Sequence, residues 1–119
     1  MLLHPDLRVN QPKKNGATPF FVACDNAELD CVRVLLSHPA IDINLAREGG
    51  ETPLYSACQD GRVECVQLLL QHPTTRVNQA QKNGATPLFI ACQEGELECV
   101  RLLVSQPRVG QPADLNQPT

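Results

Sequence analysis

The feature that most constrains this chain is a period of 34 residues that runs through nearly its whole length. The segment Gly16–Pro19 returns as Gly50–Pro53 and again as Gly84–Pro87, and both steps are 34 residues. Four further series keep this interval: Pro5, Pro39, Pro73 and Pro107; Asn10, Asn44 and Asn78; Cys24, Cys58 and Cys92; and Cys31, Cys65 and Cys99. A fixed period of this size is typical of chains that stack one small motif on the next. We therefore expect a solenoid of repeated units.

The composition agrees with thin, closely stacked layers. The chain has 119 residues, which is enough for one domain, and it contains three Phe, one Tyr and no Trp. A compact core of this size normally uses more aromatic side chains, because each of them buries a large area. Leu, Val, Ile, Ala and Cys supply most of the apolar content instead.

Each unit carries the pattern of two short helices. Thr18 is a good N-cap, and Pro19 suits the first helical position because its missing N–H would be unpaired there anyway. This first helix is predicted to close near residues 26–27. The second helix is predicted over Leu29–Leu36, with its apolar residues on one face, and Pro39 ends it.

The turns between these helices also have sequence signals. Gly61 and Gly95 stand where the first helix stops in the later copies, and glycine accepts the left-handed conformation found there. Ala27 occupies this position in the first copy, so it must tolerate or avoid that conformation. The Asn-Gly pairs at 15–16 and 83–84 favour tight hairpin turns, and the segment 41–44 is predicted to be extended.

At this point the pattern resembles the ankyrin repeat. The motif Gly-x-Thr-Pro-Leu-x-x-Ala stands as Gly84–Ala91, and Gly-x-Leu-Glu-x-Val-x-Leu-Leu stands as Gly95–Leu103. The resemblance implies an all-α fold, a helix-turn-helix solenoid with short β-hairpin-like loops between repeats. It divides the chain into a remnant of a preceding repeat (1–12), three repeats (13–46, 47–80 and 81–114) and a tail (115–119).

Three departures from the usual ankyrin pattern are visible. The period is 34 residues, where the usual repeat has about 33. Phe21, Tyr55 and Phe89 replace the usual histidine, so we expect aromatic packing in place of a side-chain hydrogen bond. The cysteines at 24, 58 and 92 take the second position of the usual Ala-Ala pair.

The six cysteines do not predict a metal site. Zinc needs four ligands at about 2.0–2.3 Å, whereas equivalent positions in adjacent repeats lie roughly 8–10 Å apart. The same distance argues against disulfides between neighbouring repeats, since their Cα atoms must lie within about 7 Å. Only a pair inside one repeat, such as Cys24 with Cys31, stays open. We expect small buried thiols that fill tight layers.

The remaining polar series have structural explanations. His4, His38 and His72 precede the periodic prolines, and we interpret them as polar residues at helix ends. Asp30, Glu64 and Glu98 are predicted to be solvated helix positions. No Ser/His/Asp set, phosphate-binding loop or Glu-His metal motif stands outside the period, so we predict neither an enzyme nor a cofactor.

The charge and hydropathy patterns limit the classes of partner that we expect. The net charge of −3 gives no reason to expect nucleic acid, whose binders carry concentrated basic patches. No apolar run approaches the roughly 20 residues that span a bilayer. Residues 1–3 are too short an apolar stretch for a signal peptide. The expectation is an intracellular, cytoplasmic protein that binds neither membranes nor nucleic acid.

The resemblance implies where a protein partner would bind, because ankyrin arrays usually use their hairpin tips and first helices, the concave side of the stack. The tip positions are Lys13, Lys14 and Asn15; Arg47, Glu48 and Glu51; and Gln81, Lys82 and Asn83. The first-helix positions are Asp25 and Asn26; Gln59 and Asp60; and Gln93 and Glu94. Together they predict an acidic floor (Asp25, Asp60, Glu94) with a more basic rim (Lys13, Lys14, Arg47, Lys82). Such a groove suits a partner segment with Lys or Arg; an ordinary solubilising surface is the alternative.

The ends of the array look uncapped. Residues 1–5 match the tail of a second helix, and Val104–Pro107 finishes a helix whose outer face carries Leu102 and Leu103. Repeat arrays need polar terminal caps to prevent fraying and association. We therefore expect either a fragment of a longer array or a chain whose ends stack on copies of itself. The leading hypothesis is a protein-binding or scaffolding module, because a repeat array presents an extended surface. The alternative is a purely structural spacer or a self-stacking segment of a longer repeat array.

Overall fold

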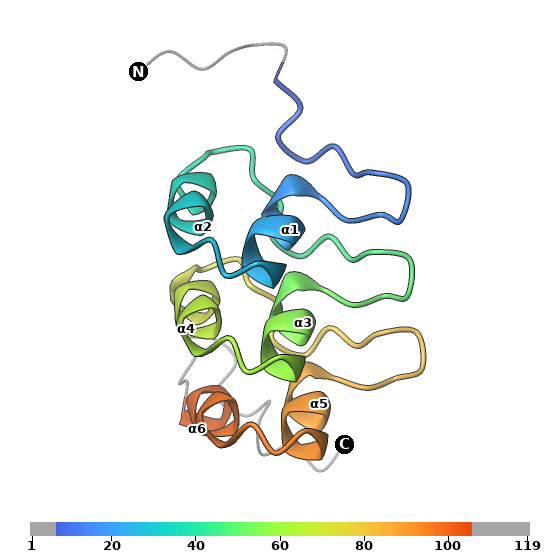
Figure 1. Cartoon of the computed structure of the whole chain (residues 1–119), viewed down its shortest axis with the longest axis vertical. Helices are drawn as coiled ribbons and strands as arrows, with labels where there is room; N and C mark the ends of the chain where they lie inside the picture. Colours follow the sequence, from blue (N-terminus) through green and yellow to red (C-terminus); the bar gives the residue numbers. More distant parts are fainter. Residues whose placement is uncertain (1–6, 106–119) are drawn as a thin grey trace.

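The computed structural model describes residues 7–105, which form three pairs of helices and no strand. The first pair is α1 (Pro19–Asp25) and α2 (Leu29–Leu36). The second is α3 (Pro53–Gln59) and α4 (Val63–Gln71), and the third is α5 (Pro87–Gln93) and α6 (Leu97–Ser105). The pairs stack in chain order, with a loop projecting to one side before each pair (Figure 1). The predicted all-α solenoid is confirmed.

The first helix of each pair begins as the Thr-Pro signal predicts. The hydroxyls of Thr18 and Thr52 accept hydrogen bonds from the backbone N–H three residues later, both at 3.1 Å, and Thr86 does so at 3.2 Å. Each cap satisfies one of the N–H groups that a helix start leaves without an internal partner. The proline that follows lacks an N–H, so it leaves none unsatisfied.

The first helices also end as predicted, in the left-handed conformation. Ala27 has a φ of 55°, and Gly61 and Gly95 have φ values of 68° and 70°. Glycine adopts this conformation without steric cost, whereas alanine places its Cβ against the following carbonyl oxygen. The turn between α1 and α2 is therefore the most strained of the three.

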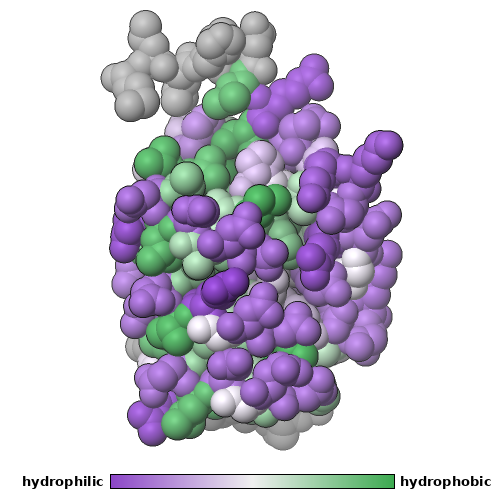
Figure 2. All heavy atoms as spheres, in the orientation of Figure 1, coloured by the Kyte–Doolittle hydropathy of each residue, from purple (hydrophilic) through white to green (hydrophobic). Residues whose placement is uncertain are grey.

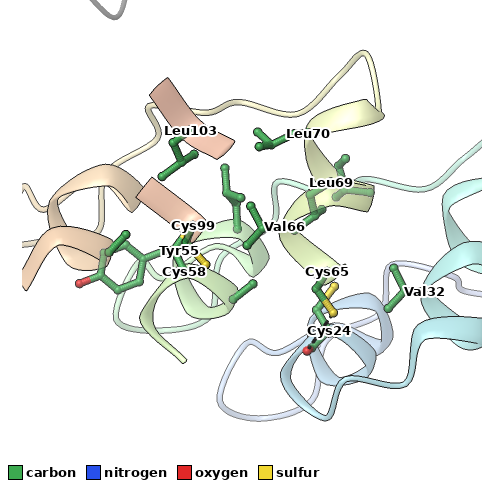
Figure 3. Packing of buried hydrophobic residues seen from close by; sticks show 14 of the residues in the cluster. Cys24, Val32, Tyr55, Cys58, Cys65, Val66, Leu69, Leu70, Cys99 and Leu103 are labelled. Carbon is green, nitrogen blue, oxygen red and sulfur yellow. Dashed lines mark hydrogen bonds between the residues drawn. The ribbon is translucent and has the colours of Figure 1, made fainter. Parts of the chain in front are cut away.

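The helices form two columns, with α1, α3 and α5 in one and α2, α4 and α6 in the other (Figure 1). α3 packs between α1 and α5, and α4 packs between α2 and α6. The core runs through all three pairs and is built mainly from aliphatic side chains and thiols (Figure 3). Phe20, Val32, Val66 and Leu69 are completely buried in it.

The loop before each helix pair is a tight turn, but its geometry differs from the predicted one. In the first loop the N–H of Gly16 donates to the carbonyl of Lys13 (2.9 Å), and the N–H of Lys13 donates to that of Ala17 (2.9 Å). The central residues are therefore Lys14 and Asn15. Gly16 follows them at a φ of 86°. This is a turn closed by a left-handed glycine, not a two-residue Asn-Gly turn.

The periodic asparagines join neighbouring units. Asn10 donates through Nδ2 to the carbonyl of Ala40 (2.8 Å) and accepts at Oδ1 from the N–H of Asp42 (2.9 Å). Asn44 repeats this one unit further on, with the carbonyl of Thr74 (2.9 Å) and the N–H of Arg76 (2.8 Å). The segment predicted to be extended over 41–44 contains a turn at 43–44.

Part of the predicted organisation lies outside the described residues. It comprises residues 1–6 of the predicted remnant, with His4, and everything from 106 onward, with Pro107, the end of the third predicted repeat and the tail. Leu103, predicted on an outer helix face, is buried at 4% exposure, because it packs into the core cluster. Leu102 is only half-buried.

Candidate functional site

The loop tips are tied to one another by backbone hydrogen bonds. The N–H of Glu48 donates to the carbonyl of Asn15 (2.9 Å), and the N–H of Lys82 donates to the carbonyl of Gly49 (3.2 Å). The two donor residues, Glu48 and Lys82, are equivalent positions of successive repeats, and so are the two acceptor residues, Asn15 and Gly49. The three tips therefore form a row of fixed spacing, and hydrophilic side chains cover it (Figure 2).

Most of the predicted partner-binding residues are exposed. Exposed tip residues are Lys13, Lys14, Asn15, Glu48, Lys82 and Asn83, and exposed first-helix residues are Asn26, Asp60, Gln93 and Glu94. Gln59 is half-buried. The loops that carry the tip residues project to the same side of the stack (Figure 1). A partner could contact several of them at once.

Two predicted tip residues, Arg47 and Gln81, instead contact the preceding unit, and a third, Glu51, pairs with Arg47. The guanidinium carbon of Arg47 lies 5.0 Å from the centre of the Phe21 ring, and its Nε is 3.2 Å from Oε1 of Glu51. Gln81, at the equivalent position of the next repeat, donates from Nε2 to the hydroxyl of Tyr55 (2.6 Å). These side chains hold the loop against the preceding first helix. Sequence comparison of equivalent positions alone does not reveal this contact.

The predicted acidic floor is not uniform. Asp60 and Glu94 are the C-cap residues of α3 and α5, and both are exposed. Asp25 is the last residue of α1, so within its repeat it stands one residue before the position of Asp60 and Glu94. It is half-buried and accepts a hydrogen bond from the hydroxyl of Ser56 (3.1 Å). The carboxylate of Asp25 therefore contributes to the junction between units, whereas Asp60 and Glu94 face solvent.

The aromatic residues that replace histidine behave in two ways. Phe21 and Tyr55 are buried, each at 2% exposure, so aromatic packing is confirmed for them. Phe89 is 57% exposed, and the same expectation is wrong for it. The reason is positional: Phe21 and Tyr55 are covered by the loop of the following unit. Burial also raises the pKa of Tyr55, and the hydrogen bond from Gln81 acts in the opposite direction.

The prediction that all six thiols are buried is correct for four of them. Cys24, Cys58, Cys65 and Cys99 are buried, but Cys31 and Cys92 are exposed, and all six are free. Cys31 lies on the outward side of the first unit and Cys92 on that of the third. Neither has a neighbouring unit on that side within the described residues.

The buried cysteines are paired across the unit junctions. The Cys65 thiol donates to the backbone carbonyl of Cys24 (Sγ to O 3.6 Å), and the two thiols are in contact (Figure 3). Cys58 and Cys99 form the same pair one unit further on. The expectation that thiols of neighbouring repeats stay apart is therefore wrong. It compared equivalent positions, whereas these pairs join a first helix to the second helix of the next unit.

Cys24 and Cys58 stay in the protonated form in these pairs, whereas the side-chain hydrogen bond with Cys24 lowers the pKa of Cys65. The thiol–thiol hydrogen bond with Cys65, together with burial, raises the pKa of Cys24 far above its ordinary value. Burial is the main cause that raises the pKa of Cys58. Such thiols are poor nucleophiles, because the thiolate is the reactive form. They act as packing groups in the core.

The other polar series lie where the sequence analysis placed them. The ring nitrogens Nδ1 of His38 and His72 accept from backbone N–H groups two residues later, at 3.0 and 3.3 Å, so both histidines close helix ends. Asp30, Glu64 and Glu98 are exposed. In the part of the chain from 7 to 105, no cluster of three or more His, Cys, Asp or Glu residues could hold a metal ion. Each helix in that part falls short of the length and apolar character needed to cross a bilayer.

The described surface thus carries exposed charged side chains along the row of tied tips. Comparison with curated proteins gives no match. A family model described as ankyrin repeats (three copies) matches residues 1–79 and, again, residues 42–118. The two matches together cover almost the entire sequence, and they agree with the three stacked helix pairs, the Thr-Pro caps and the tied loop tips. The chain belongs to the ankyrin-repeat family.

Proposed function

We propose that this chain is a protein–protein interaction module that binds its partner along the loop tips and the ends of the first helices. Ankyrin repeats are generally modules of this kind. The observation that carries the proposal is the row of tied tips. Hydrogen bonds from Glu48 to Asn15 and from Lys82 to Gly49 fix the backbone, while the tip side chains stay exposed. A surface ordered in advance loses less entropy on binding.

The charge of this surface supports a partner segment that carries Lys or Arg. Asp60 and Glu94 are exposed at the C-terminal ends of α3 and α5. The carbonyl end of a helix carries partial negative charge, so a carboxylate there does not stabilise the helix. A cationic partner group would interact favourably with both the carboxylate and the helix end. Lys13, Lys14 and Lys82 on the rim would steer the acidic part of the same partner.

Charge reversal tests this proposal. The double variant Asp60→Lys/Glu94→Lys is compared with Asp30→Lys/Glu98→Lys, which makes the same change in net charge on the exposed side of the second helices. Both are incubated with an array of peptides grouped by their number of Lys and Arg residues. The proposal expects loss of binding to the basic peptides only in the first variant. Equal binding by both variants would contradict it.

Several finer attributes belong to the same proposal. We propose that the chain acts as a scaffold without catalytic activity, in keeping with the family's usual role. The repeat boundaries at 13–46, 47–80 and 81–114 are proposed as drawn from the period. The six free thiols support an intracellular, cytoplasmic location, since disulfides form in oxidising compartments.

A second candidate function is a structural segment that stacks on other copies. The observation that favours it is the exposure of apolar side chains at both ends of the described array, among them Val22, Phe89 and Leu97. A pure spacer would be indifferent to the chemistry of the tips. The peptide array above therefore separates the two candidates.

A further inference from the structure

The first end of the stack exposes side chains that the inner junctions bury. Val22 is 36% exposed, whereas Ser56 and Ile90 at the equivalent positions are 3% and 4% exposed. Cys31 is exposed, whereas its equivalents Cys65 and Cys99 are buried. What buries the equivalents is the helix pair stacked before them. This face of α1 and α2 is therefore a junction face with no helix pair described in front of it.

The opposite end of the described stack, at α5 and α6, also exposes side chains whose equivalents are buried. Phe89 is 57% exposed, against 2% for its equivalents Phe21 and Tyr55. Cys92 is exposed, whereas the equivalent Cys24 and Cys58 are buried. Leu97, at the start of α6, is 59% exposed. The equivalent residues of the α1–α2 and α3–α4 pairs face the helix pair that follows them.

The first end is also hollowed. A hollow of about 520 Å³ lies there, and Pro19, Val22, Cys31 and Leu35 are among the residues that line it. The equivalent Leu69 and Leu103 are buried, at 0% and 4% exposure. At the inner junctions this space is filled by the preceding helix pair. Val22, Cys31 and Leu35 give the hollow an apolar lining, and Phe89 and Leu97 are apolar residues that the opposite end exposes.

The cysteine pairs indicate which residues would meet if the two outer faces packed together as the inner junctions do. Each inner junction joins a cysteine of a first helix to a cysteine of the next second helix: Cys24 to Cys65, and Cys58 to Cys99. Cys92 and Cys31 are the two halves of one further pair, at opposite ends of the described stack. They are also the two exposed thiols.

We propose that two copies of this chain stack head to tail, with the α5–α6 end of one against the α1–α2 end of the next. In this register Cys92 meets Cys31, and Lys13 covers Phe89 as Arg47 covers Phe21. The N–H of Lys14 donates to the carbonyl of Asn83, continuing the tip ladder. The contact repeats the inner junction of the fold, so each end receives the face that its equivalents already contact within the chain.

This contact joins two different faces, so it does not close on a dimer. A heterologous interface leaves one free face of each kind at the ends of every assembly, and assembly continues. The proposal deepens the second candidate function and does not depend on partner binding at the tips. The two can fail separately, because their experiments change different residues.

Disulfide trapping tests the register. Oxidised glutathione takes two electrons and two protons from the thiols of Cys92 and Cys31, which form a disulfide while it is reduced to two glutathione molecules. The full chain should give a ladder of dimers, trimers and larger species on a non-reducing gel. Cys31→Ser and Cys92→Ser should each remain monomeric alone, and their equimolar mixture should give a dimer and nothing larger. A dimer from either variant alone would overturn the register.

Sedimentation measures whether the chains stack when no disulfide joins them. Sedimentation under reducing conditions should show the average mass rising with concentration. Val22→Glu and Phe89→Glu each place a charge in the apolar contact and should raise the dissociation constant by at least about tenfold. Val34→Glu is the matched control, since Val34 is 69% exposed and does not line the hollow, and it should leave the constant unchanged. A wild-type chain that stays monomeric at every concentration, or a Val34→Glu effect equal to the other two, would overturn the proposal.

Discussion

The guanidinium group of Arg47 lies over the ring of Phe21, at 5.0 Å from the ring centre, and so joins the second loop to the first helix. Arg47 is only 34% exposed at its side chain, and it is also paired with Glu51. A cation held against an aromatic face in a half-buried position contributes about 1–2 kcal/mol. The contact therefore makes the loop part of the stacked core.

Arg47→Ala should lower the free energy of unfolding by about 1–2 kcal/mol, because the cation–π contact and the ion pair are both lost. Urea denaturation followed by circular dichroism measures the loss. Arg33→Ala is the matched control, since Arg33 pairs with Asp30 on the exposed side of α2. The interpretation is wrong if both variants are equally destabilised.

Tyr55→Phe should also destabilise the stack, by about 0.5–1.5 kcal/mol, because Gln81 then loses the hydroxyl to which it donates. The variants Tyr55→Phe and Gln81→Ala, with their combination, form a double-mutant cycle in which the coupling energy reports the bond. Simple additivity of the two single effects would show that the hydrogen bond carries no stability.

Thiol reactivity should divide the six cysteines into two fast and four slow groups. Cys31 and Cys92 are exposed, whereas the other four are buried. An aromatic disulfide reagent added to the folded chain should release two equivalents rapidly. Denaturant should then release four more. Cys31→Ser and Cys92→Ser should each remove one fast equivalent, and a third fast equivalent would contradict the burial of the inner pairs.

Stability should fall at alkaline pH because the Cys58 thiol stays protonated in the folded chain. Burial raises the pKa of Cys58 above its ordinary 9.0, to which it returns on unfolding. The contribution of this thiol is complete below pH 9 and is lost as the pH rises toward the folded pKa. The slope of stability against pH approaches about 1.4 kcal/mol per pH unit.

Cys58→Ala tests this dependence, with Cys31→Ala as the matched control for an exposed thiol. Urea midpoints are measured at intervals from pH 8 to pH 10.5. The Cys58→Ala protein should lose stability less steeply with pH than the Cys31→Ala protein. Equal slopes would show that the buried thiol does not govern the alkaline loss.

Gly50 and Gly84 allow the packing between tips to be measured separately from backbone strain. Both are left-handed, with φ values of 90° and 92°. A Cβ at Gly50 would lie 2.7 Å from the backbone nitrogen of Lys82, whereas a Cβ at Gly84 meets open space. Alanine at either position costs about 1–2 kcal/mol in backbone conformation. Gly50→Ala should cost more, since it also pushes the second and third tips apart.

The comparison uses urea denaturation together with hydrogen exchange at the amide of Lys82. That amide donates to the carbonyl of Gly49 and should exchange faster only in Gly50→Ala. If both alanine variants lose the same stability and leave this amide equally protected, the tips are not packed as described.

The elements could be predicted from the sequence because their signals are local. Thr18 and Pro19 specify a helix start, and Gly61 and Gly95 specify a stop, through backbone geometry alone. The period then supplies the stacking, since each unit buries its apolar face only against a neighbour. The predicted turn type is wrong because an Asn-Gly pair occurs in more than one kind of turn. It fits either the centre of a two-residue turn or, as here, the end of a longer one.

The contacts across the junctions could not be found by comparing equivalent positions. Tyr55 and Gln81 are 26 residues apart, and Cys24 and Cys65 are 41 residues apart. Neither separation equals the period of 34 residues. The second is that period plus the seven residues from Cys24 to Cys31, so the repeated spacing of the two cysteine series was a usable signal. The exposure of Cys31 and Cys92 depends instead on which helix pairs the described residues place beside them.

The asparagine at each junction has a mechanical consequence. Asn10 and Asn44 each hold one carbonyl and one N–H of the following link, so sliding one unit over the next breaks two hydrogen bonds together. Under load the spacing between neighbouring repeats should therefore stay constant. The stack would separate at a junction before this spacing lengthened, so a bound protein would have to match it.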